Sequence, residues 1–281
     1  MIHRNAFPLL FTSNDPVTYF IQTLIRSWRS ILFAPVLAVA LCSHLCAQDA
    51  KSLPDSPQPQ DESSEPVTLR STPRNILRDQ EAIWTSPARL NDSNAVGPAL
   101  LVLATAGLMT TDHQIMSKHF TDTSLNNHAD TASTGLLGGF VAAPAIIFGL
   151  GTIHHDDHAT ETGILGGEAM LDSLAVNEVL KIVSMRERPT LDGAHGKFFQ
   201  TNVGVDSSFA SNHSILAWSS AAVIATEYRG PLTQITAYGL ATGVSIARVA
   251  GRQHFPSDVL VGSAVGWMIG RYVVHRHRHA D

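Results

Sequence analysis

A histidine lies four residues before an aspartate in the stretch GRQHFPSD, residues 251–258. Proline lacks a backbone N–H and has a φ angle already suited to a helix, so Pro256 predicts the first position of a helix. Asp258 would then lie in the first turn, with His254 just ahead of it. A carboxylate there can bind one imidazole nitrogen, fix the tautomer and leave the other nitrogen free to attack. An isolated pair of this kind is usually a structural cap, so the chain must also supply a site for an electrophile.

A second histidine follows two residues that favour the start of a helix. Ser211 and Asn212 in DSSFASNHS are strong N-cap residues, which places His213 in the first turn of a helix. A helix N-terminus has unpaired N–H groups and a positive potential, so it can bind phosphate. Taken alone, an ordinary cap followed by a surface histidine would explain this segment equally well.

Three cations accompany the two histidines. Lys181 and Arg188 lie seven residues apart in KIVSMRERP and so project from one face near a predicted helix C-terminus. Arg248 ends the helix that precedes His254. Arginine suits bidentate contacts with phosphate oxygens, while lysine acts as a point charge. The combined set suits a tetrahedral oxyanion.

The same set predicts a reaction at phosphorus. His254 would act as the nucleophile and His213 would protonate the departing oxygen as a general acid. The cations would stabilise the charge on the equatorial oxygens of the transition state. This scheme requires no metal ion, and we expect none in the site.

The three segments resemble the signature of the type 2 phosphatidic acid phosphatase family, which shares its fold with vanadium haloperoxidases and bacterial acid phosphatases. The first family motif, Lys, six residues, then Arg-Pro, is matched in full by Lys181, Arg188 and Pro189. The second and third motifs, Pro-Ser-Gly-His and Ser-Arg, five residues, His, three residues, Asp, are represented by Ala210, Ser211, Asn212 and His213, and by Ala247, Arg248, His254 and Asp258. The resemblance covers roughly residues 95–275 in helix pattern.

The resemblance implies a role for each matching residue. The phosphate ligands would be Lys181, Arg188, Ser211, the backbone N–H of Asn212, and Arg248. His254 would become a phosphohistidine, Asp258 would orient it, and His213 would act as the acid before water cleaves the intermediate. No cofactor is implied, although vanadate could occupy the phosphate site.

Three positions depart from the family pattern. Ala210 and Ala247 remove no functional group, whereas the side chain of Asn212 stands where the family's glycine lets the backbone approach phosphate. Asparagine keeps its N–H and tolerates left-handed geometry, so we expect lower activity or a narrower substrate range rather than loss of the site. Two alternatives stay open: a vanadate-dependent haloperoxidase on the same residues, and a non-enzymatic helical protein whose site has decayed. Retention of every ionisable position argues against decay.

The elements that would position these residues are helices. We predict an all-α fold, a bundle of about six helices of the phosphatase and haloperoxidase type. The helical patterns cover residues 75–84, 97–112, 134–153, 161–187, 212–228, 231–249 and 256–275. The run 134–153 is the longest without a charge, but it contains five glycines and Pro144, so a membrane span and a buried bundle helix explain it equally well.

The N-terminal segment indicates export. Arg26 and Arg29 precede the apolar run Ile31–Leu41, and we predict an export signal over residues 1–47, cleaved rather than kept as an anchor. Both cysteines, Cys42 and Cys46, fall within it, so the folded part would carry no disulfide.

The remaining domain boundaries follow from composition. Residues 48–74 form an acidic linker rich in proline and serine, residues 75–275 a helical phosphatase domain, and residues 276–281 a basic tail. The formal net charge of −5 does not indicate the basic surface that binding of nucleic acid requires. We therefore expect an exported enzyme on the periplasmic side that acts on a phosphomonoester or a lipid phosphate. Association with a membrane and the oligomeric state stay open.

Two further clusters have simpler explanations. HHDDH, residues 154–158, resembles a metal-ligand string, yet contiguous residues rarely converge on one ion and acids are expected before a helix. HRHRH, residues 275–279, is interpreted as a solvated basic tail.

Overall fold

The structure is a computed structural model that describes residues 67–91, 94–203 and 206–277. Within these ranges the fold is all-helical, as predicted, with no strand. The α-helices there are α3 (Thr72–Thr85), α4 (Val96–Lys118), α5 (Thr123–His154), α6 (Asp157–Ser184), α7 (Asn212–Glu227), α8 (Pro231–Ala250) and α9 (Pro256–His277). The predicted export signal and the linker as far as Pro66 lie outside the described residues.

Each predicted helix is present, and α5 differs most from its expected bounds. It begins at Thr123, eleven residues before the predicted start at residue 134. The carboxylate of Asp122 caps it by accepting hydrogen bonds from the backbone N–H groups of Ser124 and Leu125 at 2.8 and 3.3 Å. The first turns of α5 are polar and largely exposed, so they lack the apolar periodicity that revealed the rest of the helix.

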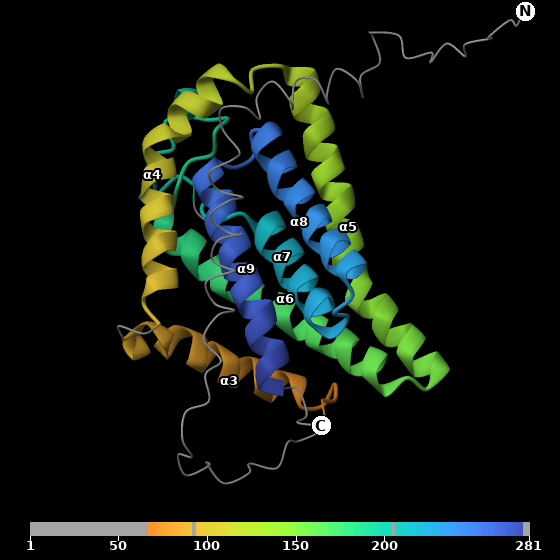
Figure 1. Ribbon diagram of the computed structural model, residues 1–281. Coiled ribbons are helices and arrows are strands. Elements are labelled where there is room, and N and C mark those ends of the chain that lie inside the picture. Colours follow the sequence, from red (N-terminus) through yellow and green to blue (C-terminus); the bar gives the residue numbers. More distant parts are fainter. Residues whose placement is uncertain (1–66, 92–93, 204–205, 278–281) are drawn as a thin grey trace, which may run out of the picture.

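The helix α7 lies at the centre of the bundle, enclosed by α6, α8 and α9 (Figure 1). Its buried positions are mostly alanine and serine, and both side chains are small enough for neighbouring helices to approach closely. The buried serine hydroxyls are satisfied locally or between helices, for example Ser220 Oγ, which donates to the carbonyl of Phe140 at 3.2 Å.

A glycine face on α9 sets how α9 packs against α7. A side chain added at Gly262, Gly266 or Gly270 would collide with the backbone of α7. The residues that these glycines face are, in the same order, Ser211, Ile215 and Ser219. The residue numbers increase in the same direction along both helices, so α7 and α9 run parallel. Their N-termini, with the second and third sequence motifs, therefore lie at the same end of the bundle.

Two outer helices complete the fold. Helix α4 packs against α9, and α3 crosses the opposite end of the bundle, where α9 terminates (Figure 1). In the described part of the chain, α5 is the one helix long and apolar enough to cross a membrane, and 17% of its most apolar window is buried. Core helices of soluble proteins also meet this criterion, so α5 alone does not establish a span.

Candidate active site

Three segments meet where α7 and α9 begin. Lys181 lies in the last turn of α6, and its side chain is buried. Ser211 is the N-cap of α7, as predicted, and its oxygen accepts from the backbone N–H of Ser214 at 3.4 Å. The backbone N–H of Ser211 donates to the carbonyl of Asp258 at 3.3 Å, which joins the start of α7 to the first turn of α9. The three predicted motifs therefore lie next to one another in the fold.

The imidazole of His254 is fixed by a backbone carbonyl. His254 is 2% exposed, and its Nδ1 lies 2.7 Å from the carbonyl oxygen of Ser208. A carbonyl only accepts hydrogen bonds, so Nδ1 must carry the proton. The tautomer with a proton on Nδ1 leaves a lone pair on Nε2, which is the form needed for nucleophilic attack.

Asp258 lies beside His254 but does not bind it directly. Its Oδ2 is 3.9 Å from Nδ1 of His254. That oxygen instead accepts hydrogen bonds from Ser208 Oγ at 2.5 Å and from the backbone N–H of Phe255 at 2.9 Å. Asp258 thus holds both the residue whose carbonyl fixes the imidazole and the residue that follows His254. In this structure the orienting effect expected of Asp258 passes through Ser208.

A buried arginine within the first motif supports Asp258. Arg186 is 2% exposed, and its Nη1 donates to Asp258 Oδ1 at 2.5 Å and to Ser257 Oγ at 2.7 Å. Its Nη2 donates to Asp112 of α4 at 2.8 Å, and Asp112 also binds the hydroxyl of Ser257. The guanidinium lies over the ring of Phe255, 4.1 Å from its centroid. Sequence reasoning missed this network, because Arg186 reads there as one of the six spacer residues of the motif.

Two of the predicted phosphate ligands are held by carboxylates at the edge of the site. Arg188 donates through Nη2 to Asp206 at 2.8 Å and through Nη1 to the carbonyl of Gln253 at 3.1 Å. Arg248 binds Asp130 of α5, and its Nε is buried without a hydrogen-bond partner among the described residues. Both carboxylates are substantially exposed, so the guanidinium groups are oriented while the carboxylates keep much of their hydration.

The two histidines lie in the same positive field. Burial lowers the pKa of His213 to about 4, and the nearby cations Arg248, Arg188 and Lys181 contribute in the same direction. Burial likewise lowers the pKa of His254 well below its usual value, again with help from these three cations. Both histidines are therefore neutral at pH 7 when no anion is bound, and a bound phosphate would raise their pKa values.

His213 differs from His254 in its hydrogen bonding. Its Nε2 is buried and has no hydrogen-bond partner among the described residues. A buried polar atom without a partner is costly, so it indicates a group that is satisfied when a ligand is present. This arrangement suits a proton donor to the leaving group of a bound ester.

The side chain of Asn212 is engaged by α6. Its Oδ1 accepts a hydrogen bond from Asn177, and its Nδ2 donates to Glu178 Oε1 at 3.4 Å. Neither contact uses the backbone N–H of Asn212, which lies in the first turn of α7 and has no hydrogen-bond partner among the described residues. The asparagine that replaces the family's glycine thus binds to α6 through its amide, which the sequence could not indicate.

The HHDDH cluster serves as a helix boundary. Asp156 caps α6 by accepting from the backbone N–H of Ala159 at 3.0 Å, and His158 binds Glu227 at 2.9 Å. Within the described ranges, the residues whose metal-ligating atoms converge are Asp79, Glu168 and His277 rather than any part of this cluster.

The site combines the buried His254, the partly buried His213, three surrounding cations and two helix N-termini, a set of groups that suits a bound anion. Comparison with known proteins identifies the class of protein more closely. Residues 163–280 match the family model described as the PAP2 superfamily, and this range contains every predicted site residue. This part of the chain, residues 163–280, is therefore assigned to the PAP2 superfamily.

Individual relatives are more distant. A lipid A 1-phosphatase of Porphyromonas gingivalis is 35% identical over 65 residues, which cover 22% of this chain and 15% of the relative. The crystal structure of a transmembrane PAP2 type phosphatidylglycerolphosphate phosphatase from Bacillus subtilis aligns with a TM-score of 0.44 at 22% identity. That alignment covers 74% of this chain and 94% of the other.

Proposed function

We propose that the protein is a phosphatase that hydrolyses the phosphomonoester of a lipid phosphate through a phosphohistidine intermediate. The observation that carries the proposal is the hydrogen bond from His254 Nδ1 to the Ser208 carbonyl, because it leaves the lone pair of Nε2 free beside three cations. The match of residues 163–280 to the PAP2 superfamily supports the same chemistry.

The first step forms the intermediate. Nε2 of His254 attacks phosphorus, and the bond from phosphorus to the ester oxygen breaks. His213, protonated once the phosphate dianion has raised its pKa, donates its proton to the departing alcohol. Lys181, Arg188 and Arg248 bind the equatorial oxygens and stabilise their charge in the transition state.

The second step returns the enzyme to its starting form. A water molecule attacks phosphorus, and the bond from phosphorus to Nε2 of His254 breaks. The neutral His213 accepts the proton of that water, so the two steps together consume one water and release an alcohol and inorganic phosphate. The Ser208 carbonyl stabilises the Nδ1–H of His254 throughout.

Two observations favour a lipid substrate over a soluble one. The P. gingivalis relative is described as a lipid A 1-phosphatase. The flank of α5 carries exposed aliphatic side chains, including Ile146 and Ile153 at 57% and 72% exposure. Exposed apolar patches of this kind mark contacts with a membrane or a partner, and a membrane would deliver a lipid phosphate to the site. Together with the predicted export signal, this supports action at the periplasmic side of a membrane.

The test compares phosphate release from phosphatidic acid vesicles and from a chromogenic phosphomonoester, with a metal chelator present. We expect turnover that resists the chelator, favours the lipid and is lost in His254→Ala. His128→Ala is the matched control, since His128 is an exposed histidine on α5. Quenching with alkaline denaturant during turnover of a radiolabelled substrate should trap labelled phosphate on the chain, stable to base and labile to acid.

Four results would overturn the proposal. Full activity in His254→Ala would exclude the nucleophile, and complete inhibition by the chelator would indicate metal-dependent hydrolysis. Vanadate-dependent halide oxidation without phosphate release would identify the site as that of a haloperoxidase. Absence of both activities in the folded protein would favour a decayed site.

A further inference from the structure

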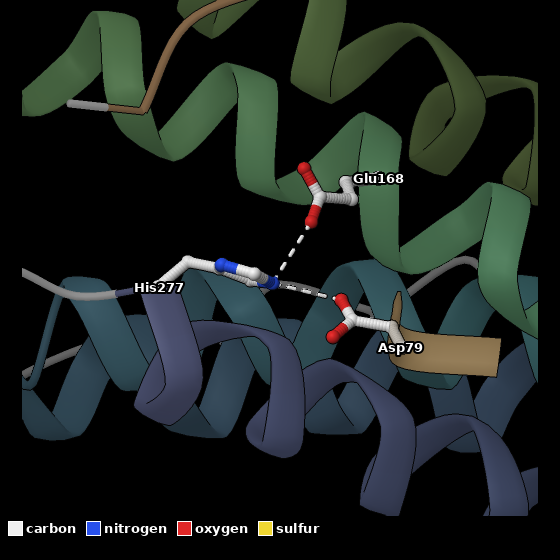
Figure 2. A group of neighbouring side chains, drawn as sticks. All are labelled: Asp79, Glu168 and His277. Atoms are coloured by element: carbon white, nitrogen blue, oxygen red, sulfur yellow. Dashed lines mark hydrogen bonds and ion pairs between the residues drawn. The ribbon is translucent and has the colours of Figure 1, made fainter. Parts of the chain in front are cut away.

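A second cluster of chemically reactive side chains lies at the opposite end of α9. Asp79 of α3, Glu168 of α6 and His277 of α9 converge there (Figure 2). Nε2 of His277 lies 2.8 Å from Asp79 Oδ2 and 3.1 Å from Glu168 Oε1. Both carboxylates are fully buried, and the side chain of His277 is 13% exposed. The sequence indicated a solvated tail for residues 275–279, but α9 continues to His277 and places its imidazole between the two acids.

Each carboxylate has one oxygen held by the protein and one directed at the shared point. Asp79 Oδ1 accepts from the hydroxyl of Tyr272 and pairs with Arg276, both at 3.2 Å. Glu168 Oε2 accepts from Asn75 Nδ2 at 3.4 Å. The remaining oxygens, Asp79 Oδ2 and Glu168 Oε1, face His277. Outer hydrogen bonds of this kind orient the ligands in metal sites.

The protein leaves this cluster without enough hydrogen-bond donors. A neutral His277 has at most one proton on Nε2, and Asp79 lies closer to it than Glu168 does. Glu168 Oε1 is buried and has no hydrogen-bond partner among the described residues, and the same holds for Oδ2 of the neighbouring Asp172. Arg276, whose Nε lies 3.2 Å from Asp79 Oδ1, is itself 44% exposed. A buried acceptor without a donor, in a region with excess negative charge, indicates an additional cation.

We propose that Asp79, Glu168 and His277 bind a divalent transition-metal ion of the Zn²⁺ type. One imidazole nitrogen with two carboxylate oxygens is a donor set that Zn²⁺ accepts, whereas Mg²⁺ and Ca²⁺ prefer oxygen alone. Tetrahedral bonds of about 2.0–2.1 Å would separate neighbouring ligand atoms by roughly 3.3 Å. The ligand atoms here all lie within 4.8 Å of one another, so small side-chain movements suffice. Water would take the fourth position.

The role of this ion is structural. It joins α3 to α6 and to the end of α9, three elements that are far apart in sequence. His277 lies nineteen residues after Asp258 on α9, about 28 Å along the helix axis. The ion would therefore hold α3 on the bundle without touching the phosphate site.

Protons are the competing occupants of this cluster. Burial raises the pKa of Glu168 to about 7 and the pKa of Asp172 to about 7. A proton shared between the carboxylates would also satisfy the oxygens that lack a hydrogen-bond donor. In that case no metal ion would bind stoichiometrically, and added Co²⁺ would show no ligand-field absorption from this site. The two occupants can therefore be separated by direct binding measurements.

The experiment titrates the chelator-stripped full chain with Co²⁺ and, separately, with Zn²⁺ while its thermal unfolding is followed. We expect one Co²⁺ per chain with visible absorption typical of low coordination number, and a rise in Tm on adding Zn²⁺. Glu168→Gln and His277→Gln should each weaken Co²⁺ binding at least tenfold and abolish the rise in Tm. The matched controls, Glu81→Gln on α3 and His275→Gln on α9, change exposed residues near the cluster and should bind as the wild type does.

The outcomes separate the proposal from its alternatives. Absence of stoichiometric binding, or binding that survives both ligand substitutions, would overturn it and leave the protonated cluster. Should a ligand variant fail to fold, X-ray absorption of the Zn²⁺-loaded wild type decides the question. A single imidazole among the ligands of the ion would support the proposed site. No imidazole, or several, would show that the ion binds elsewhere and would overturn the proposal. None of these readouts depends on phosphatase activity.

Discussion

At the scale of single residues, His254 and His213 share one electrostatic environment but have different partners. The Ser208 carbonyl holds one nitrogen of His254, whereas Nε2 of His213 has no hydrogen-bond partner among the described residues. A nucleophilic histidine needs a fixed tautomer, and a general acid needs a nitrogen that is free to donate its proton to the substrate. The proposed division of roles thus follows from hydrogen bonding rather than from differences in charge.

The protonation of His213 should respond strongly to phosphate. Its pKa of about 4 lies below the ordinary value because of burial and nearby cations, so in the free protein the imidazole stays neutral as pH falls through 6.5. Bound phosphate adds negative charge and favours the protonated form, which shifts the pKa upward. NMR titration of the His213 ring between pH 5 and 8 should show no protonation alone and clear protonation with inorganic phosphate. A His213 ring whose titration is the same with and without phosphate would contradict the argument.

The sequence revealed the residues of the site better than their connections. The spacing of the motifs identified Lys181, Arg188, His254 and Asp258, but not their helix geometry. Helix α6 ends at Ser184, so Arg188 lies in the loop after it rather than on one helix face with Lys181. The role of Ser208 could not be predicted, because its contact with His254 joins a loop to a helix start 46 residues later. Arg186 lay inside a recognised motif, but its partner Asp112 is 74 residues away on α4. Such pairings depend on tertiary packing and leave no local pattern.

At the scale of elements, Arg186 connects the loop after α6 to α4 and α9. Arg186→Met would leave Asp112 and Asp258 buried without their cation, and removing one partner of a buried ion pair costs roughly 3–5 kcal/mol. We expect a loss of this size in urea unfolding, together with loss of activity as Asp258 shifts. Adding Asp112→Asn should recover part of the stability, since it removes one uncompensated charge. A loss below about 1 kcal/mol would contradict the assigned role.

The glycine face of α9 should be equally sensitive. Gly266→Ala places a methyl group against the backbone of Ile215, which must move α7 away from α9 and separate the two helix N-termini of the site. We expect lower Tm and lower turnover, because the cost of overpacking is typically about 1–3 kcal/mol. Gly239→Ala on α8 is the matched control: nothing lies within 4 Å of the added methyl, and alanine favours helix by up to about 1 kcal/mol. Equal effects of both substitutions on Tm would refute the packing argument.

At the scale of the whole molecule, the bundle separates its two polar clusters along α9. The proposed phosphate site lies where α7 and α9 begin, and the cluster of Asp79, Glu168 and His277 lies where α9 ends. Figure 1 shows the course of α9 between these two ends. Between these ends, the flank of α5 presents aliphatic side chains outward. This distribution explains why the sequence fitted both a membrane span and a bundle helix for residues 134–153: the segment belongs to the bundle and is also largely uncovered by it.

The exposed flank of α5 gives the proposed lipid specificity a direct test. Ile146→Asp combined with Leu150→Asp puts two charges on side chains that are 57% and 51% exposed, so the bundle itself should tolerate them. Burying a charge in a membrane is costly, and the double variant should therefore sediment less with phosphatidic acid vesicles and hydrolyse that lipid at least tenfold more slowly. Turnover of a soluble chromogenic phosphomonoester should stay near that of the wild type, because neither residue belongs to the phosphate site.

The control Asn127→Asp changes the polar end of the same helix and should affect neither substrate. Parallel loss on both substrates would indicate structural damage, whereas unchanged lipid turnover would remove α5 as the membrane contact and with it the structural support for a lipid substrate.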